Sequence, residues 1–285
     1  MTTMHTSGPV AAATTTAASE SAVQAADVQP AGVSRRPESV KSADRTVDVL
    51  ETLAANDGRL TFSELQRRLD VPKSSLHAIL RTLVARGWVD TDERASAYGI
   101  GLRALRAGAS FLDRDPVVQA AGTVLTRLRH HLDETVHLAR LDGCDVVYLA
   151  SRESQHHLRV ASRIGRRLPA HATALGKALL AARTWEEVDR VLPHRLIALT
   201  DHTVTDRQTL REELSDTRVR GWAYEAEQNT PGLACVAVAL PSSSSLDAVS
   251  CSIPLARATD AHLAEAVKAI TAAASEISAM ARVRY

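Results

Sequence analysis

Two groups of polar side chains in this 285-residue sequence have residue types and spacings that suit the binding of charged or polar ligands. The first occupies the segment KSSLHAILR and consists of Lys73, Ser74, Ser75, His77 and Arg81. The second includes Ser250 and Ser252, which alternate with apolar residues in the segment AVSCSIP. Cationic and hydroxyl groups bind phosphates and base edges, and closely spaced hydroxyls suit a small polar molecule. Either kind of binding requires a helix or a strand that places these side chains on one face.

The first group lies on a predicted helix over residues 73–87. Its apolar residues recur at intervals of three and four, which is the spacing of one buried helix face: Leu76, Ile79, Leu80 and Leu83. His77 and Arg81 lie four residues apart, so they share the opposite face of this helix. The sequence therefore predicts a helix that packs on one side and presents polar groups on the other.

The flanking segments predict a winged helix-turn-helix over residues 41–101. Two shorter helices are expected before the polar helix, and Thr61 with Glu64 forms a capping-box pattern at the start of the second. After the polar helix, two short extended runs flank a polar turn that contains Arg94, which is typical of a hairpin. Three helices followed by a hairpin, with a tight break before the third helix, are typical of this DNA-binding motif.

Charge is concentrated at this motif. The chain has 34 basic and 33 acidic residues and a formal net charge of +1, which excludes nucleic-acid binding through overall charge. Between residues 67 and 86, however, one acid, Asp70, accompanies these basic residues: Arg67, Arg68, Lys73, Arg81 and Arg86. We therefore expect double-stranded DNA as a partner, with Lys73, Ser74, Ser75, His77 and Arg81 in the major groove and Arg94 on a phosphate. A merely solvated basic face is the alternative.

The rest of the N-terminal half predicts a tail and a connecting helix. Residues 1–40 are rich in Ala, Thr and Ser and predict a disordered tail. Residues 102–115 predict a linker helix whose apolar stripe packs either on a second copy of the chain or on its own C-terminal domain. No basic and apolar leader and no long apolar run occur, so we expect a cytoplasmic protein with no membrane partner.

Residues 116–282 predict an α+β domain with an antiparallel sheet. A helix begins at Pro116, a hairpin turns at Asp142 and Gly143, and a third strand is expected over residues 156–165. Further helices, a second hairpin from Leu233 to Pro254 and a closing helix complete the domain. Ser250 and Ser252 share one face of a strand, and Cys235 can lie on the neighbouring strand.

The three cysteines form no CxxC pair, and the histidines lack metal-ligand spacing, so neither a disulfide framework nor a metal or other cofactor is expected. A cysteine-dependent enzyme with Cys235 and His171 as nucleophile and base is one alternative, but no third orienting residue and no GxSxG motif are evident. We therefore expect no enzyme. A dimeric ligand-binding adaptor without specific DNA binding is another alternative, and it leaves the basic residues around the third helix unexplained.

Three stretches of the C-terminal half resemble the IclR family of bacterial transcription regulators: IGRRLPAHATALGKALLA, YEAEQNTPGLACVAVALP and AVSCSIP. The resemblance covers roughly residues 40–282. It implies an N-terminal winged helix-turn-helix, a dimerising linker helix and a C-terminal effector domain with a GAF/PAS-like fold. It also implies a homodimer or homotetramer on operator DNA, with a small molecule, often a carboxylic acid, controlling that binding. We expect a repressor of a catabolic operon.

The resemblance also implies an effector site, at Gly165, Glu225, Cys235, Ser250 and Ser252. Glu225 occupies a loop position at which the family more usually has Asp. Two hydroxyls, a thiol and a helix N-terminus near Ala172 are donors that suit a carboxylate, whereas an anionic Glu225 would accept from a hydroxyl. This combination favours a hydroxy or keto acid as the effector, and sugar acids are among the candidates.

Overall fold

The structure, a computed structural model, describes residues 40–94, 96–159, 163–241 and 247–283. The predicted tail lies outside the described residues except for residue 40, and so do residues 242–246 in the predicted turn of the second hairpin. Among the described residues, no helix is long and apolar enough to cross a membrane.

The N-terminal domain is a winged helix-turn-helix. Its helices are α1 (Lys41–Ala54), α2 (Phe62–Arg68) and α3 (Lys73–Ala85). Its antiparallel sheet has the order β1-β3-β2 and consists of β1 (Leu60–Thr61), β2 (Val89–Thr91) and β3 (Ala97–Ile100). The capping box is formed, because the Thr61 hydroxyl accepts from the Glu64 amide and the Glu64 carboxylate accepts from the Thr61 amide. Leu65, Leu76 and Leu80 lie in the core that holds the helices together.

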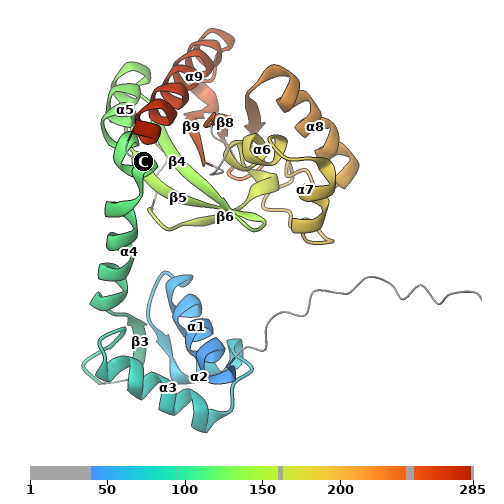
Figure 1. Cartoon of the computed structure of the whole chain (residues 1–285). Helices are drawn as coiled ribbons and strands as arrows, with labels where there is room; N and C mark the ends of the chain where they lie inside the picture. The colour runs from blue at the N-terminus through green and yellow to red at the C-terminus, as the bar shows by residue number, and fades with distance from the viewer. Residues whose placement is uncertain (1–39, 95, 160–162, 242–246, 284–285) are drawn as a thin grey trace, which may run out of the picture.

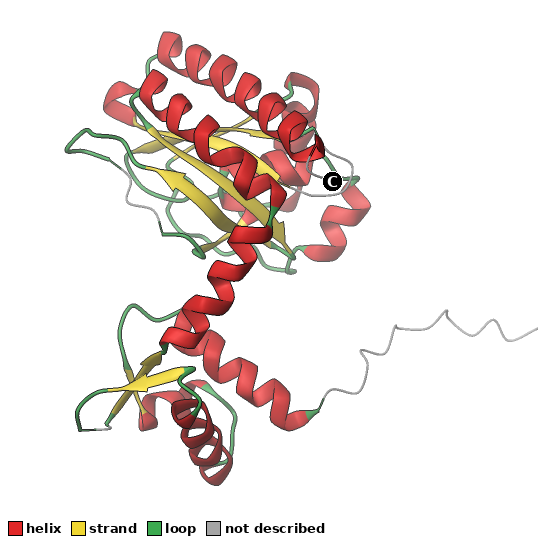
Figure 2. Cartoon of the chain, turned by 60° about the vertical axis from the view of Figure 1, so that its left-hand side comes forward, coloured by secondary structure: helices red, strands yellow, loops and turns green. Residues whose placement is uncertain are grey.

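Helix α4 (Leu102–Arg114) joins this domain to α5 (Pro116–Leu132), the first helix of the C-terminal domain (Figures 1 and 2). None of its residues is buried, and the side chains of Leu102 and Leu105 are 72% and 65% exposed. Asp115 ends α4 and begins α5, since its carboxylate accepts from the amides of Val117 and Val118. The apolar stripe predicted for the linker is therefore present, with Leu102 and Leu105 uncovered within this chain and Leu112 packed against the core of the C-terminal domain.

The C-terminal domain contains one antiparallel sheet of order β6-β5-β4-β9-β8-β7. Its strands are β4 (Thr135–Asp142), β5 (Asp145–Arg152), β6 (Arg167–Pro169), β7 (Ala223–Ala226), β8 (Leu233–Ala239) and β9 (Asp247–Pro254). Gly143 adopts φ 62° in the first hairpin, at the predicted turn. The two hairpins meet where β4 pairs with β9, so strands more than a hundred residues apart in sequence lie side by side.

Two layers of helices cover the sheet. Helices α5 and α9 (Asp260–Val283) pack against each other over one face, as Figure 2 shows. Helix α6 (Ala174–Ala181) packs on the other face, and α8 (Arg207–Arg220) packs against α6. The remaining elements are α7 (Trp185–Val191) and two 3-10 turns, η1 (Ala170–Ala172) and η2 (Leu255–Arg257). The architecture is the predicted α+β class.

Two local expectations were wrong. No strand forms in the described part of residues 156–165, because Ser154 turns the chain by donating to the Asp133 carbonyl and accepting from the His156 amide. The edge strand is instead β6. Glu225 lies on strand β7 and not in a loop. Its charge at a buried position hides the alternation that normally marks a strand.

Candidate functional site

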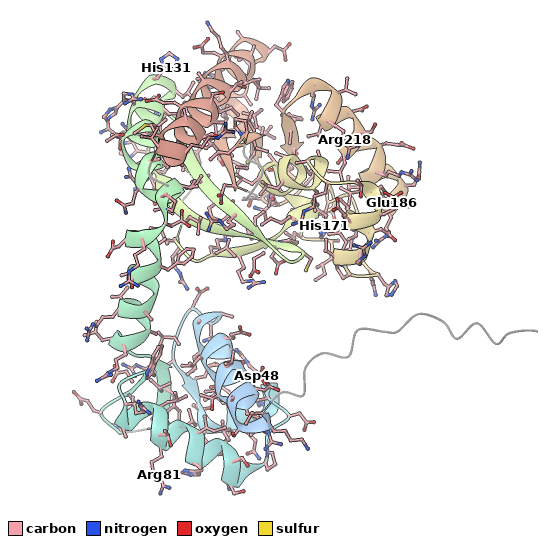
Figure 3. The ribbon with its side chains drawn as sticks, in the orientation of Figure 1. Asp48, Arg81, His131, His171, Glu186 and Arg218 are labelled. Atoms are coloured by element: carbon pink, nitrogen blue, oxygen red, sulfur yellow. The ribbon has the colours of Figure 1, made fainter. Side chains whose placement is uncertain are left out.

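Helix α3 presents its polar groups on the surface, as its spacing predicts. Lys73, Ser74, His77 and Arg81 are exposed and Ser75 is half-buried, whereas the leucines of the opposite face are buried. Figure 3 shows Arg81 extending from α3 on the side away from the C-terminal domain. The exposed face therefore has the shape and the donors that a major groove accepts.

Two neighbours shape this surface. The His77 ring contacts the Phe62 ring of α2, with 4.9 Å between ring centroids and the ring planes tilted by 37°. Arg94 lies exposed in the turn between β2 and β3, where Asp92 accepts hydrogen bonds from Ser96 and the Ala97 amide. Arg94 is thus carried by the wing and the other five DNA-binding candidates by α3.

Three of the five effector candidates form one row across the second sheet. Glu225 of β7 lies opposite Cys235 of β8, Cys235 lies opposite Ser252 of β9, and Ser252 lies opposite Thr135 of β4. The Cys235 thiol and the Ser252 hydroxyl are 3.3 Å apart and hydrogen-bonded. Because directly opposite residues of a sheet point to the same side, the row lines the face beneath α6.

A second row lies two residues along the same face. Ser250 of β9 lies opposite His137 of β4, and His137 lies opposite Ser151 of β5. The Ser151 hydroxyl is 3.0 Å from Nδ1 of His137, and the Tyr148 ring meets the imidazole edge-on with 5.0 Å between centroids. Sequence analysis missed His137, Ser151 and Tyr148. The alternation of polar and apolar residues in TVHL of β4 was the available signal for His137.

Gly165 does not lie on this sheet face. It occupies an exposed turn with φ 82°, a conformation that favours glycine, and its amide donates to the Tyr148 carbonyl at 2.8 Å. The turn is thereby attached to β5 beside His137. Arg166, its neighbour, is exposed, and its charge acts on both His137 and Tyr148.

Helix α6 starts two residues later than predicted, at Ala174. The Thr173 hydroxyl accepts from the Gly176 amide at 3.0 Å, so that N–H group is not free to meet an anion. A side chain at Gly176 would place its Cβ 2.1 Å from the Ala170 carbonyl oxygen, so only glycine permits this close approach of η1. The start of α6 is thus fixed by the Thr173 cap and by the close packing of Gly176 against η1.

A buried hydrogen-bond chain links Glu225 to α6 and α8. The Glu225 carboxylate accepts from the Gln228 amide at 2.9 Å, and the Gln228 side-chain oxygen accepts from the Lys177 ammonium at 2.6 Å. Lys177, which is fully buried, also pairs with Glu213 at 2.5 Å. Burial lowers the pKa of Lys177 and raises the pKa of Glu225. The protein has thus placed a carboxylate on the sheet face at an electrostatic cost.

Most of the other groups on this face are uncharged at neutral pH. Burial, with a smaller effect from Arg166, lowers the pKa of His137 to about 3, so its imidazole is neutral. Burial and the nearby Glu225 raise the pKa of the Cys235 thiol well above its ordinary value, so the thiol stays protonated. The face therefore offers hydroxyl, thiol and imidazole groups that can donate or accept hydrogen bonds, beside one carboxylate.

The geometry does not pair Cys235 with His171. Nε2 of His171 lies 3.0 Å from the Ile197 carbonyl oxygen, whereas Cys235 contacts Ser252. The thiol stays protonated, and its hydrogen-bond partners are the Ser252 hydroxyl and the Glu225 side chain, not His171. Within the described ranges, no group of three or more His, Cys, Asp or Glu side chains is arranged to hold a metal ion.

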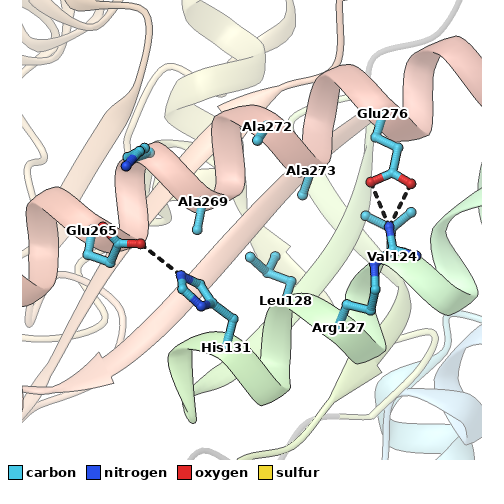
Figure 4. A pocket seen from close by; sticks show the side chains of 10 residues that line it. Val124, Arg127, Leu128, His131, Glu265, Ala269, Ala272, Ala273 and Glu276 are labelled. Carbon is cyan, nitrogen blue, oxygen red and sulfur yellow. Dashed lines mark hydrogen bonds and ion pairs between the residues drawn. The ribbon is translucent and has the colours of Figure 1, made fainter.

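A groove of about 420 Å³ lies between α5 and α9, on the opposite side of the sheet from the polar rows (Figure 4). Its floor includes Leu128 and Ala273. An ion pair between Arg127 and Glu276 crosses it, and so does a contact of 2.7 Å between the His131 ring and the Glu265 carboxylate. None of the eleven candidate site residues lines this groove. The groove is therefore a separate surface feature.

Comparisons with known proteins agree with both domains. Residues 42–93 match the IclR helix-turn-helix domain, and residues 109–279 match the domain described as bacterial transcriptional regulator IclR C-terminal. The chain is 36% identical over 242 residues to the HTH-type transcriptional regulator BhcR of Paracoccus denitrificans, covering 84% of this chain and 86% of that protein. It is 31% identical over 244 residues to the transcriptional repressor IclR of Escherichia coli, covering 84% and 89%.

A solved structure shares the arrangement. The crystal structure of an IclR homolog from Microbacterium hydrocarbonoxydans, complexed with 4-hydroxybenzoate, has a TM-score of 0.71 and 27% identity, and the match covers 85% of this chain and 99% of that one. The chain belongs to the IclR family of DNA-binding transcription regulators, whose C-terminal domain binds a ligand.

Proposed function

We propose that residues 41–101 bind operator DNA with α3 in the major groove. The supporting observation is the exposed row of Lys73, His77 and Arg81, which lie four residues apart on a helix whose other face is buried. Lys73 and Arg81 supply charge, and Ser74, Ser75 and His77 are placed to meet base edges. Arg94 reaches a phosphate from the wing.

Residues 116–282 bind the effector, on the sheet face that carries Glu225, Cys235, Ser250 and Ser252, with Gly165 in the adjoining turn. This face holds hydroxyl and thiol donors, a neutral imidazole and one buried carboxylate, which together suit a small organic acid that also carries a hydroxyl or keto group. The hydroxylated aromatic acid in the Microbacterium hydrocarbonoxydans homolog has this chemistry. Sugar acids have it as well.

Residues 102–115 act as a dimerising linker in a homodimer or homotetramer. Leu102, Leu105 and Phe111 of α4 are exposed, which is costly unless a second copy covers them. Two α3 helices about 34 Å apart would meet successive major grooves, and the effector changes that spacing. In this proposal the chain is a repressor of a catabolic operon and has no enzymatic activity.

Titration of DNA from upstream of the gene, followed by fluorescence anisotropy, tests the DNA-binding proposal. We expect preference over scrambled DNA by about 10³-fold or more. Arg81→Ala is expected to weaken specific binding by about 10- to 100-fold, because a base contact is worth about 1–3 kcal/mol. Arg190→Ala, on exposed α7, changes the net charge equally and serves as the control. Equal loss in both variants, or none in Arg81→Ala, removes Arg81 from the site; absence of binding favours the adaptor.

The same assay with added 4-hydroxybenzoate, glyoxylate and gluconate tests the effector proposal. We expect one of these acids to change DNA affinity, and Ser252→Ala to raise the concentration needed by about 10-fold, because a hydrogen bond to a charged group is worth about 1.5–3 kcal/mol. Basal DNA binding by Ser252→Ala should equal that of the wild type. An unchanged acid response in this variant would exclude Ser252 from the site.

A further inference from the structure

Arg140 of β4 hydrogen-bonds the junction between α4 and α5 to the sheet, beside the apolar packing of Leu112 and Val117. Its Nη1 donates to Oδ2 of Asp115 at 2.7 Å, while Nε and Nη2 donate to the two carboxylate oxygens of Asp247 at 2.7 and 2.9 Å. The carboxylates of Asp115 and Asp247 are 8% and 0% exposed. Three charge-assisted hydrogen bonds among nearly buried groups make this a strong and geometrically specific joint.

Each partner of Arg140 belongs to a different part of the chain. Asp115 ends α4, with its amide donating to Phe111, and begins α5 through the hydrogen bonds that its Oδ1 accepts from Val117 and Val118. The Arg140 guanidinium also lies over the Phe111 ring, 5.9 Å from its centroid. The last turn of the linker helix is therefore attached to β4 both through Asp115 and through Phe111.

The same two strands carry the polar rows of the candidate effector face. Arg140 lies directly opposite Asp247, and three residues further along each strand His137 lies directly opposite Ser250. His137 and Arg140 are three residues apart and therefore point to opposite faces of the sheet, so the backbones of β4 and β9 connect the two pairs. A displacement of β4 against β9 at the His137–Ser250 pair is expected to shift the Arg140–Asp247 pair as well. Because Asp115 is hydrogen-bonded to Arg140, the end of α4 is expected to move with Arg140.

We propose that Arg140 is the positioning residue through which the sheet sets the direction of α4, and with it the placement of the DNA-binding domain. The inference deepens the proposed function and rests on it for its regulatory consequence. Arginine is required because a planar guanidinium can bond two carboxylates at fixed angles, whereas a lysine ammonium is a single point donor. A lysine at position 140 would keep the positive charge but would not hold the two carboxylates in a fixed relative orientation.

Hydrogen exchange of the full-length protein tests the joint without any ligand. In Asp115→Asn, one side-chain oxygen still caps α5, but the amide group replaces the carboxylate oxygen that Arg140 contacts. We expect amides of residues 109–118 to exchange about 10-fold faster or more in Asp115→Asn and in Arg140→Lys. Arg127→Lys alters an exposed arginine–carboxylate pair of the same domain and should leave these amides unchanged. Wild-type rates in Asp115→Asn and Arg140→Lys would overturn the proposal.

A second arm measures exchange with upstream DNA present. In the wild type, we expect DNA binding to change the exchange rates of residues 135–141 and 247–254, because coupling between two sites is reciprocal. In Asp115→Asn, DNA should still bind while this change is lost. The same change in both proteins, or no change in the wild type, would overturn the coupling. Failure of the wild type to bind DNA would overturn the proposed function and its coupling, while the first arm would still decide the joint.

Discussion

The two faces of the C-terminal sheet are both covered by helices but differ chemically along β8 and β9. On the side of α5 and α9, strands β8 and β9 contribute Val236, Val249, Cys251 and Ile253 to an apolar core. On the other side, the same two strands present Cys235, Ser250 and Ser252, none of which is exposed. Along β9, hydroxyl-bearing side chains thus alternate with side chains of the apolar core.

This difference indicates that apolar burial stabilises the domain, whereas the polar rows serve the proposed effector binding. Burial of apolar surface contributes about 25 cal/mol per Å², and both sides of the sheet supply it, because an apolar cluster that includes Leu175 and Leu179 of α6 surrounds the polar rows. The α6 side buries hydroxyls, a neutral imidazole and a carboxylate, which cost free energy unless they are hydrogen-bonded. Polar groups that are buried at this free-energy cost are expected at a binding site, because a bound ligand can complete their hydrogen bonds.

Truncating a buried side chain on the apolar face is expected to give the largest loss of stability. Ile253 is completely buried on that side, so Ile253→Ala should lower the free energy of unfolding by about 2–5 kcal/mol. Denaturant titration of the purified variants measures it. Ser252→Ala, one residue away on the other face, is the matched control and should lose less than about 1 kcal/mol. Similar losses in the two variants would break the distinction between the faces.

The two cysteines of these strands allow an isosteric test. Cys251 lies in the apolar cluster, so Cys251→Ser would leave a buried hydroxyl with poor partners and should cost about 1–3 kcal/mol. The Cys235 thiol is already hydrogen-bonded to the Ser252 hydroxyl. In Cys235→Ser the new hydroxyl can make the same hydrogen bond, so this change should cost less than about 1 kcal/mol. Thermal unfolding compares the pair, and a larger cost for Cys235→Ser would contradict the assignment.

The polar rows also predict a sensitivity of folding to acid. The pKa of His137 is about 3 in the folded chain and 6.5 when exposed, so the unfolded state binds more protons between these values. Stability from the neutral imidazole is present above pH 6.5 and decreases by about 1.4 kcal/mol for each pH unit below it. Relative to His137→Gln, wild-type unfolding energies should show this slope from pH 6.5 to 5. A constant difference would contradict it.

Local sequence predicted most of the elements and their inward faces, although it misplaced the edge strand β6 and put Glu225 in a loop. Thr61 with Glu64 marks the start of α2, Pro116 is the first residue of α5, and the alternation in AVSCSIP correctly places Ser250 and Ser252 on one side of β9. These features follow from capping and periodicity, which depend on residues only a few positions apart. The winged helix-turn-helix was predictable for the same reason, because each of its elements is short and continuous.

Only the tertiary structure decided which strands are neighbours and which distant charges meet. The pairing of β4 with β9 brings His137 to Ser250 and Arg140 to Asp247, and Asp115 joins the same arginine from the end of the linker. Periodicity gives a strand its two faces but does not specify its partner, since pairing is the sum of many weak contacts across the whole domain. The hydrogen bonds that fix Arg140 therefore depend on the folded sheet and not on any local pattern.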